Sequence, residues 1–182
     1  MAIKADITEK DLVRRCLAGD AKSQQQLYAK YASVLYSICL RYARNTENAK
    51  DLLQESFIKV FDGLKYFRFE GSFEGWMKRV SVNTCLDFNK KLKNEPYNEE
   101  LEFHIEVGEG EKISSDLHVE DLFKLLQQLP AGYRTVFNLY AIEGFSHHEI
   151  AESMGITEST SKTQLFKARK MLQAMLARME EK

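Results

Sequence analysis

SHHEIAESMGITESTSKTQLFKARKML, residues 146–172, is the stretch that decides the fold, because it holds the start and stop signals of two helices. Ser146 and Glu149 form the S-x-x-E pattern of a capping box, which predicts a helix start at the serine. Gly155 can adopt the left-handed conformation that ends a helix, and Thr157 can cap the next one. The spacing predicts a helix-turn-helix, whose second helix would lie in the major groove of DNA. A plain helical hairpin with a solvated outer face is the alternative.

The second helix of this motif is expected to be polar and basic on its outer face. Residues 158–178 carry five basic side chains and the single acid Glu158, a net charge of +4. Such a face offers positive charge for phosphates and hydrogen-bonding groups for base edges. The side chains that we expect to be exposed there are Ser159, Ser161, Lys162, Thr163, Gln164, Phe166 and Lys167.

The rest of the chain also follows helical patterns, so the expected fold class is all-α. Before the helix-turn-helix, a leucine-rich helix should stop at Pro130, and another should run from this proline to Gly144. In residues 1–93 the apolar side chains recur at steps of three and four, which predicts four helices. Their expected N-caps include Thr8, Thr46 and Ser72.

The segment between the two helical regions is strongly acidic. Residues 94–121 hold ten acidic side chains against Lys112 alone, a net charge of −9 in a chain whose total is −1, so the remainder carries +8. We expect a flexible acidic linker over residues 94–115, between helical domains at 1–93 and 116–182. Two basic blocks are the charge distribution of a nucleic-acid-binding protein.

A second motif interleaves aromatic and basic side chains within residues 67–93. Such interleaving suits single-stranded DNA, because bases stack on rings while cations follow the backbone. On pattern alone, however, Phe73 and Trp76 fit a hydrophobic core better than a stacking platform, and Asn83 could satisfy backbone groups. The composition of this motif leaves both interpretations open.

Several other functions are excluded by what the sequence lacks. It has no apolar run long enough for a membrane span and no apolar N-terminal signal, so we expect a cytoplasmic protein without membrane insertion. Cys16, Cys39 and Cys85 are far apart and suggest reduced thiols. The neighbouring His147 and His148 point in different directions on a helix and lack a third ligand, so no metal site is expected. No nucleophile–base pair, phosphate loop or dinucleotide motif predicts an enzyme or a cofactor.

Three dispersed motifs together resemble the extracytoplasmic-function (ECF) group of σ70-family factors, the minimal factors that contain only regions two and four. AKDLLQESFIKVFDGL (49–64) resembles the region-two helix that docks on the clamp helices of the polymerase β′ subunit. FEGSFEGWMKRVSVNTCLDF (69–88) resembles the promoter-opening segment that follows it. Residues 129–172 resemble region four. The motifs occur in the family's order and cover nearly everything outside the acidic linker.

The resemblance implies roles for individual residues. Those implied to lie on the polymerase-docking face are Asp51, Gln54, Glu55 and Phe57. Those implied to line a pocket for a flipped base of the −10 element are Gly63, Phe67 and Asn83. Those implied to meet the −35 element are Lys162, Thr163, Phe166 and Lys167. Ser159 and Ser161 depart from the family pattern, which often has glycine and an aliphatic residue there, so the preferred −35 sequence does not follow from the resemblance.

The function implied by the resemblance is that of a σ factor, a dissociable subunit that directs RNA polymerase to promoters and helps to open them. The implied partners are the core enzyme, through its β′ clamp helices and β flap, and promoter DNA, with an anti-σ factor as a further candidate. The family opens promoters through binding energy and needs no cofactor. A free-standing helix-turn-helix regulator is the alternative, although no coiled-coil seam for a dimer is apparent. An enzyme such as a nuclease is disfavoured by the lack of a catalytic cluster.

Overall fold

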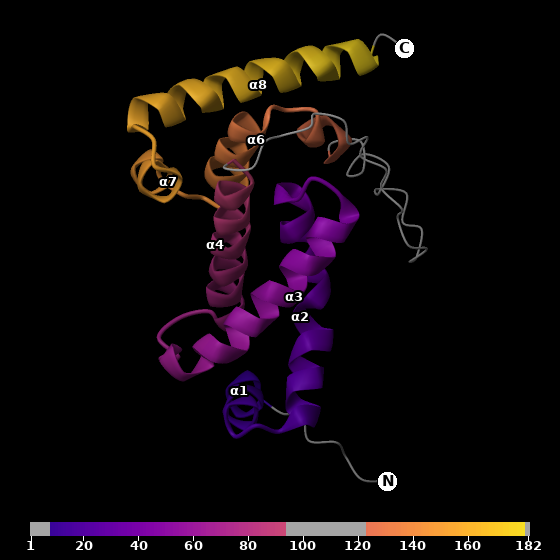
Figure 1. The fold of residues 1–182 in the computed structure, drawn as a ribbon, viewed down its shortest axis with the longest axis vertical. Coiled ribbons are helices and arrows are strands. Elements are labelled where there is room, and N and C mark those ends of the chain that lie inside the picture. Colours follow the sequence, from indigo (N-terminus) through magenta and orange to yellow (C-terminus); the bar gives the residue numbers. More distant parts are fainter. Residues whose placement is uncertain (1–7, 94–122, 181–182) are drawn as a thin grey trace. The chain divides into compact units, whose positions relative to one another are not determined.

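The computed structural model describes residues 8–93 and 123–180, and in these ranges every regular element is a helix (Figure 1). The chain divides into two compact units, Met1–Asn98 and Glu99–Lys182. The expected all-α fold is therefore confirmed. The acidic linker that we expected at residues 94–115 lies outside the described residues. No helix in the described part of the chain is long and apolar enough to cross a membrane.

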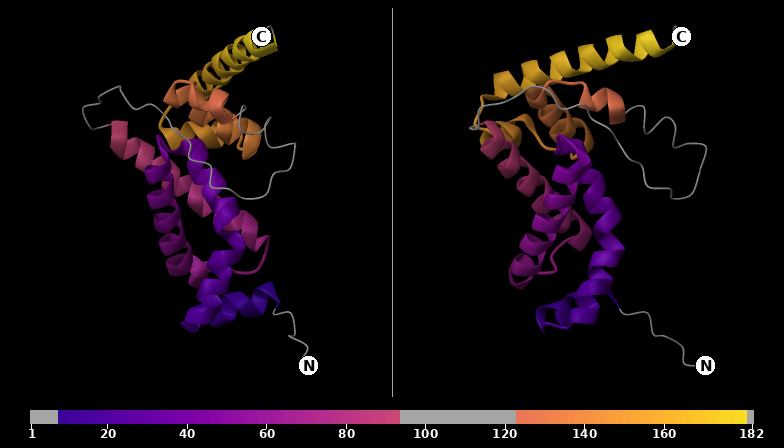
Figure 2. Two further views of the ribbon diagram at one scale, coloured as in Figure 1. Left: turned by 90° about the vertical axis from the view of Figure 1, so that its right-hand side faces the viewer. Right: turned by 45° about the vertical axis from the view of Figure 1, so that its right-hand side comes forward.

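Three long helices pack on one another in the first unit, and a short one packs on the first of them. The short helix is α1 (Glu9–Leu17), and the long ones are α2 (Ala21–Tyr42), α3 (Thr46–Gly63) and α4 (Phe73–Lys93). Helices α2, α3 and α4 contact one another pairwise, and α1 contacts α2 (Figures 1 and 2). A 3₁₀ turn, η1 (Leu64–Tyr66), leads from α3 into the loop before α4. The fully buried side chains between the helices include Leu27, Leu35, Ile38, Tyr42, Leu52, Val60, Phe73 and Met77.

The N-caps of these helices are those predicted from the sequence, with one exception. Thr8 Oγ1 accepts a hydrogen bond from the Asp11 backbone at 3.2 Å, and Ser72 Oγ accepts one from the Gly75 backbone at 3.1 Å. The cap of α3 is the side chain of Asn45 instead of Thr46, because Asn45 Oδ1 accepts from the Asn48 backbone at 2.8 Å. The Asn45 side chain reaches the N–H of Asn48, the third residue of α3, and Thr46 is therefore the first residue inside the helix.

A buried tyrosine hydroxyl also joins α2 to α1 in the first unit. The Tyr31 hydroxyl on α2 donates a hydrogen bond to Glu9 Oε2 on α1 at 2.5 Å. Burial, followed by this contact, raises the pKa of Tyr31 above its usual value, so the hydroxyl stays protonated and remains a donor. The three cysteines, Cys16, Cys39 and Cys85, are all buried thiols that form no disulfide.

The second unit contains helices α6 (Ala131–Phe137), α7 (His147–Met154) and α8 (Glu158–Glu180). Both α6 and α7 pack on α8. One part of its core consists of Leu125, Leu126, Leu129, Ala168 and Leu172. Residues 123–127 are helical, so part of the helix expected before Pro130 is present, and the remainder of that helix lies outside the described residues.

The single helix that we expected to run to Gly144 is instead divided. After α6 the backbone widens into the π-helix η2 (Asn138–Ile142), in which the Glu143 backbone N–H donates to the Asn138 carbonyl at 3.0 Å. Asn138 and Leu139, the first two residues of this π-helical turn, are both buried. Gly144, at φ 77°, then ends the element in the left-handed conformation.

The helix-turn-helix is built as the sequence predicts. Ser146 Oγ accepts from the Glu149 backbone at 3.2 Å, and Glu149 Oε2 accepts from the Ser146 backbone at 2.9 Å, which completes the capping box. Gly155 ends α7 at φ 66° and ψ 39°. Thr157 caps α8 by accepting a hydrogen bond from the Thr160 backbone at 3.1 Å. These local signals set the turn between α7 and α8.

Candidate nucleic-acid interface

The outer face of α3 presents polar side chains around one exposed apolar residue. Asp51 and Gln54 are exposed, and Glu55 forms an ion pair with Lys59 at 3.1 Å. Ile58, one turn further along the same face, has 61% of its side chain accessible. An apolar side chain with this exposure, ringed by polar ones, is a typical contact point for another protein.

Phe57, which the resemblance assigned to this face, lies inside the domain. It is only 3% exposed, and its ring lies 4.5 Å from that of Tyr28 on α2. Its spacing on the apolar stripe of α3 explains this position, because the stripe must face α2 and α4. Sequence reasoning missed Ile58, although it is the apolar residue of α3 that falls out of step with the stripe.

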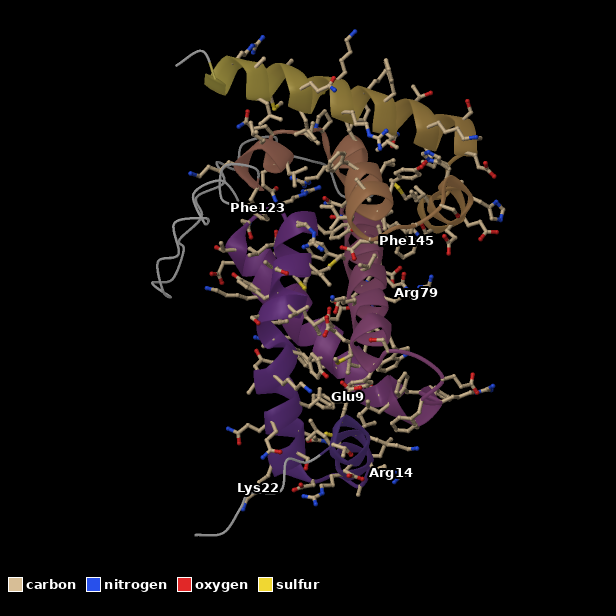
Figure 3. All side chains as sticks on the ribbon, turned by 180° about the vertical axis from the view of Figure 1, so that it is seen from behind. Glu9, Arg14, Lys22, Arg79, Phe123 and Phe145 are labelled. Atoms are coloured by element: carbon tan, nitrogen blue, oxygen red, sulfur yellow. The ribbon has the colours of Figure 1, made fainter. Side chains whose placement is uncertain are left out.

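A hollow of about 410 Å³ lies between the loop after η1 and the first turns of α4. Three aromatic residues line it, and the ring centroids of two of them, Phe67 in the loop and Trp76 on α4, lie 5.4 Å apart. Two cations also line it, and one of them, Arg79, extends outward from α4 (Figure 3). The full lining is Tyr66, Phe67, Arg68, Glu70, Gly71, Ser72, Gly75, Trp76 and Arg79. Rings together with cations are the chemistry that binds single-stranded nucleic acid.

The structure does not bring the three residues expected in a base pocket together. Phe67 lines the hollow. Gly63 lies behind its wall, where an added Cβ would be 3.1 Å from Cζ2 of Trp76, so glycine is what allows the indole to pack on α3. Asn83 is exposed two turns along α4 from Trp76 and does not line the hollow. The sequence pattern favoured a core position for Trp76 and left a stacking role open, and the residue is half-buried and lines the hollow.

Contacts of Phe69 hold the loop beside the hollow in place. Phe69 adopts a left-handed backbone at φ 58°, and its side chain does not line the hollow. Its ring instead meets Phe67 edge-on at 5.0 Å, and Lys10 of α1 lies 5.4 Å from its centroid. A non-glycine residue in this conformation costs about 1–2 kcal/mol, so these contacts are needed to maintain it.

In the second unit, α8 exposes most of the side chains that the sequence predicted. Lys162, Thr163, Phe166 and Lys167 are all exposed, and Phe166 has 66% of its side chain accessible. Lys162 lies 3.8 Å from Glu158 one turn earlier, and Lys167 lies 6.0 Å from the ring centroid of Tyr133. The outer face of α8 therefore combines cations, a hydroxyl and one solvent-facing ring.

Two side chains that we expected on this face differ. Ser161 is fully buried, because it lies on the inner face of α8 with Leu165, Ala168 and Leu172, which recur after it at steps of four and three. Gln164 is half-buried at Gly132, where an added Cβ would lie 3.5 Å from its side-chain oxygen. Both side chains were expected on the outer face because they are polar, whereas the helical period places them nearer the inner face.

Models of two regions of one protein family match the chain, one in each unit. The model of σ70 region 2 matches residues 27–95, and the model of σ70 region 4 matches residues 120–172. The chain belongs to the σ70 family. The hollow and the outer face of α3 fall in its region 2, and the helix-turn-helix falls in its region 4.

Similar proteins place the chain in the ECF group of this family. It is 29% identical over 180 residues to the ECF RNA polymerase sigma-E factor of Haemophilus influenzae, with 92% of this chain and 94% of that protein covered. It is 30% identical over 161 residues to the ECF RNA polymerase sigma factor SigE of Mycolicibacterium smegmatis, covering 86% of this chain and 62% of that protein.

A solved structure shares the σ-factor fold. It is the sigma factor RpoE in complex with the anti-sigma factor NepR from Bartonella quintana, with a TM-score of 0.56 and 21% sequence identity. The match covers 86% of this chain and 98% of that one. At this identity, the likeness concerns the fold alone.

Proposed function

We propose that this σ70-family protein is a dissociable subunit of RNA polymerase that directs promoter-specific transcription initiation. The observation that carries the proposal is the occurrence of region 2 and region 4, in that order, in a chain that aligns over almost its whole length with an ECF σ factor. A free-standing helix-turn-helix regulator, the alternative considered from sequence, is not favoured, because region 2 would then have no role.

Region 2 would capture single-stranded −10 DNA at the hollow. Extruding a base from a duplex costs a few kcal/mol, and stacking on an aromatic side chain returns about 1–3 kcal/mol per base. Phe67 and Trp76 supply rings for this stacking, while Arg68 and Arg79 supply charge for the backbone. Asn83 would contact DNA only beyond the hollow, and Gly63 would act by supporting Trp76.

Region 4 would place α8 in the major groove of the −35 element. Lys162, Thr163, Phe166 and Lys167 are the residues proposed to face DNA, because they are exposed on one side of the helix. Cations at phosphates contribute affinity without sequence preference, whereas hydroxyl and apolar contacts to base edges distinguish sequences. A solvent-facing aromatic such as Phe166 suits the methyl group of thymine.

Other surfaces would bind proteins. Asp51, Gln54 and Glu55, together with Ile58, form the proposed docking face for the β′ clamp helices, and Phe57 supports this face from within. Region 4 would meet the β flap. The complex of the Bartonella quintana protein with an anti-sigma factor supports an inhibitor of this class as a further partner.

We propose region 2 at residues 1–93, an acidic linker at 94–115 and region 4 at 116–182. A σ factor works by binding, so we propose that the protein has no catalytic centre of its own and uses no cofactor. Its site of action would be the cytoplasm, where RNA polymerase meets the chromosome.

Reconstitution with core RNA polymerase tests the proposal. The purified chain should co-elute with the core enzyme in gel filtration, and the complex should produce run-off transcripts from a subset of random promoter templates. Core enzyme alone is the control. Binding to duplex DNA without binding to the core enzyme would instead support a free-standing regulator.

A further inference from the structure

The recognition helix α8 carries a buried hydroxyl on its inner face. Ser161 is 0% exposed and occupies a position at which the neighbouring inner residues are Leu165 and Ala168. A hydroxyl that is removed from water without a partner is destabilising, so its partner is part of the structure of this interface.

That partner is His147, the first residue of α7. His147 Nδ1 and Ser161 Oγ are joined by a hydrogen bond of 2.9 Å. The imidazole also stacks on the ring of Tyr140 in η2, with centroids 4.4 Å apart and an interplanar angle of 23°. The guanidinium of Arg169, two turns along α8 from Ser161, lies 5.7 Å from the same tyrosine centroid. The series of contacts thus begins and ends on α8 and passes through α7 and η2.

A hydrogen bond between helices constrains their geometry more than an apolar contact does. Aliphatic side chains tolerate sliding and rotation of one helix on another, whereas a hydrogen bond weakens steeply with distance and angle. The atoms that would meet DNA lie about 5–6 Å from the axis of α8, so a rotation of about 10° moves them by about 1 Å. A binding site tolerates displacements of only about 0.5 Å.

We propose that His147 and Ser161 are positioning residues for −35 recognition, and that their hydrogen bond fixes the orientation of α8 on α7. Lys162 and Thr163 follow Ser161 directly, so their position in the groove depends on this bond. The inference rests on the proposed function of α8 in DNA binding. Neither residue touches DNA in this proposal, because Ser161 is buried and the half-buried His147 is engaged by Ser161 and by the ring of Tyr140.

Two substitutions of His147 separate the hydrogen bond from the ring stack. His147→Phe keeps a ring against Tyr140 but removes the polar atom that faces Ser161. His147→Asn removes the ring but retains a polar group close to the position of Nδ1. The full chain would be assembled with core polymerase, and its affinity measured for duplexes with the preferred −35 sequence and with single-base changes in it.

The phenylalanine variant should lose affinity for the preferred duplex by about threefold to tenfold, the range that follows from one lost hydrogen bond. Its discrimination against single-base changes should shrink as well, because base contacts depend on orientation more than phosphate contacts do. The asparagine variant should recover most of both properties. In the double variant His147→Phe/Ser161→Ala the losses should fall well short of the product of the single effects, since both substitutions remove the same bond.

His148→Ala is the matched control, because His148 is the exposed neighbour of His147 and its imidazole faces the carboxylates of Glu152 and Glu158. It should change affinity by less than about twofold. The inference is wrong if His147→Phe binds and discriminates like the unchanged protein, or if asparagine is no better than phenylalanine. Lys162→Ala and Phe166→Ala distinguish this failure from a failure of the proposed function. If they too leave −35 binding unchanged, α8 does not face DNA; if they weaken it, only the positioning role is lost.

Discussion

Gly63 and Trp76 compete for the same space at the edge of the aromatic hollow. An alanine Cβ at position 63 would lie 3.1 Å from Cζ2 and 3.3 Å from Cη2 of Trp76, closer than ordinary contact. The backbone at Gly63 is right-handed, at φ −83°, so alanine would not strain it. Only the contact with the indole therefore opposes the substitution.

The first prediction is that the effect of Gly63→Ala changes sign with the residue at position 76. In the unchanged background, crowding costs about 1–3 kcal/mol and the better helix propensity of alanine returns about 1 kcal/mol, so we expect a net loss of about 1 kcal/mol. Trp76→Phe removes both crowding atoms, and Gly63→Ala should then stabilise by up to about 1 kcal/mol. Urea unfolding followed by helical circular dichroism measures both. An equal effect in the two backgrounds would show that the indole does not crowd this position.

At the residue scale, the sequence predicted what local chemistry controls. The Ser146–Glu149 capping box and the left-handed Gly155 need only neighbours in the chain, and both predictions are confirmed. The close packing of Gly63 under Trp76 joins two helices through a loop, so no pattern within α3 reveals it. The resemblance assigned Gly63 to a base pocket, and in the structure Gly63 does not line the hollow but lies against Trp76.

At the scale of elements, the helical period was more reliable than residue type. Polarity suggested that Ser161 faces outward, and the resemblance suggested the same for Phe57, yet both lie on the inner stripes of their helices. The sequence pattern did not predict the division of the helix at Asn138–Ile142. A π-turn depends on how its side chains pack against the rest of the domain, and η2 packs on α7, which follows it in the chain.

The second prediction concerns the turn between α7 and α8, which needs a left-handed residue at Gly155. Nothing lies within 4 Å of an added Cβ there, so the backbone conformation alone limits substitution. Gly155→Ala should lower the free energy of unfolding of region 4 by about 1 kcal/mol, and Gly155→Asn by less, because asparagine tolerates this conformation. Thermal unfolding of the full chain measures the difference. A loss for asparagine as large as that for alanine would point to a steric cause instead.

At the scale of the whole molecule, the net charge of −1 conceals a separation of charge along the chain. Residues 94–121 carry −9, and the remainder carries +8. Such a protein can have little overall attraction to DNA while its helix α8 still meets phosphates. The electrostatic contribution of a single cation is therefore visible in the salt dependence of binding more clearly than in the affinity at one salt concentration.

The third prediction uses this dependence to assign roles to two lysines of α8. Lys167, far from the N-terminus of the helix, should contact only phosphate, so Lys167→Ala should weaken −35 binding almost equally for all sequences. It should reduce the slope of log affinity against log salt by about one unit. Lys162 lies nearer the end of the helix that enters the groove and 3.8 Å from Glu158, which holds it on that side. Lys162→Ala should in addition relax the preference at one base pair by about 1–3 kcal/mol.

The measurement belongs on the complex with core polymerase, because a small isolated domain binds DNA weakly, and a salt series from low to physiological ionic strength gives the slope. Lys124→Ala is the matched control, since it removes one positive charge from the same unit outside α8. It should leave both the slope and the base preference unchanged. If the two α8 substitutions change neither property, the helix does not face DNA, and the proposed role of region 4 at the −35 element is wrong. If all three lysines change the slope equally, the attraction is a property of the whole basic unit, and α8 is not the surface that meets the phosphates.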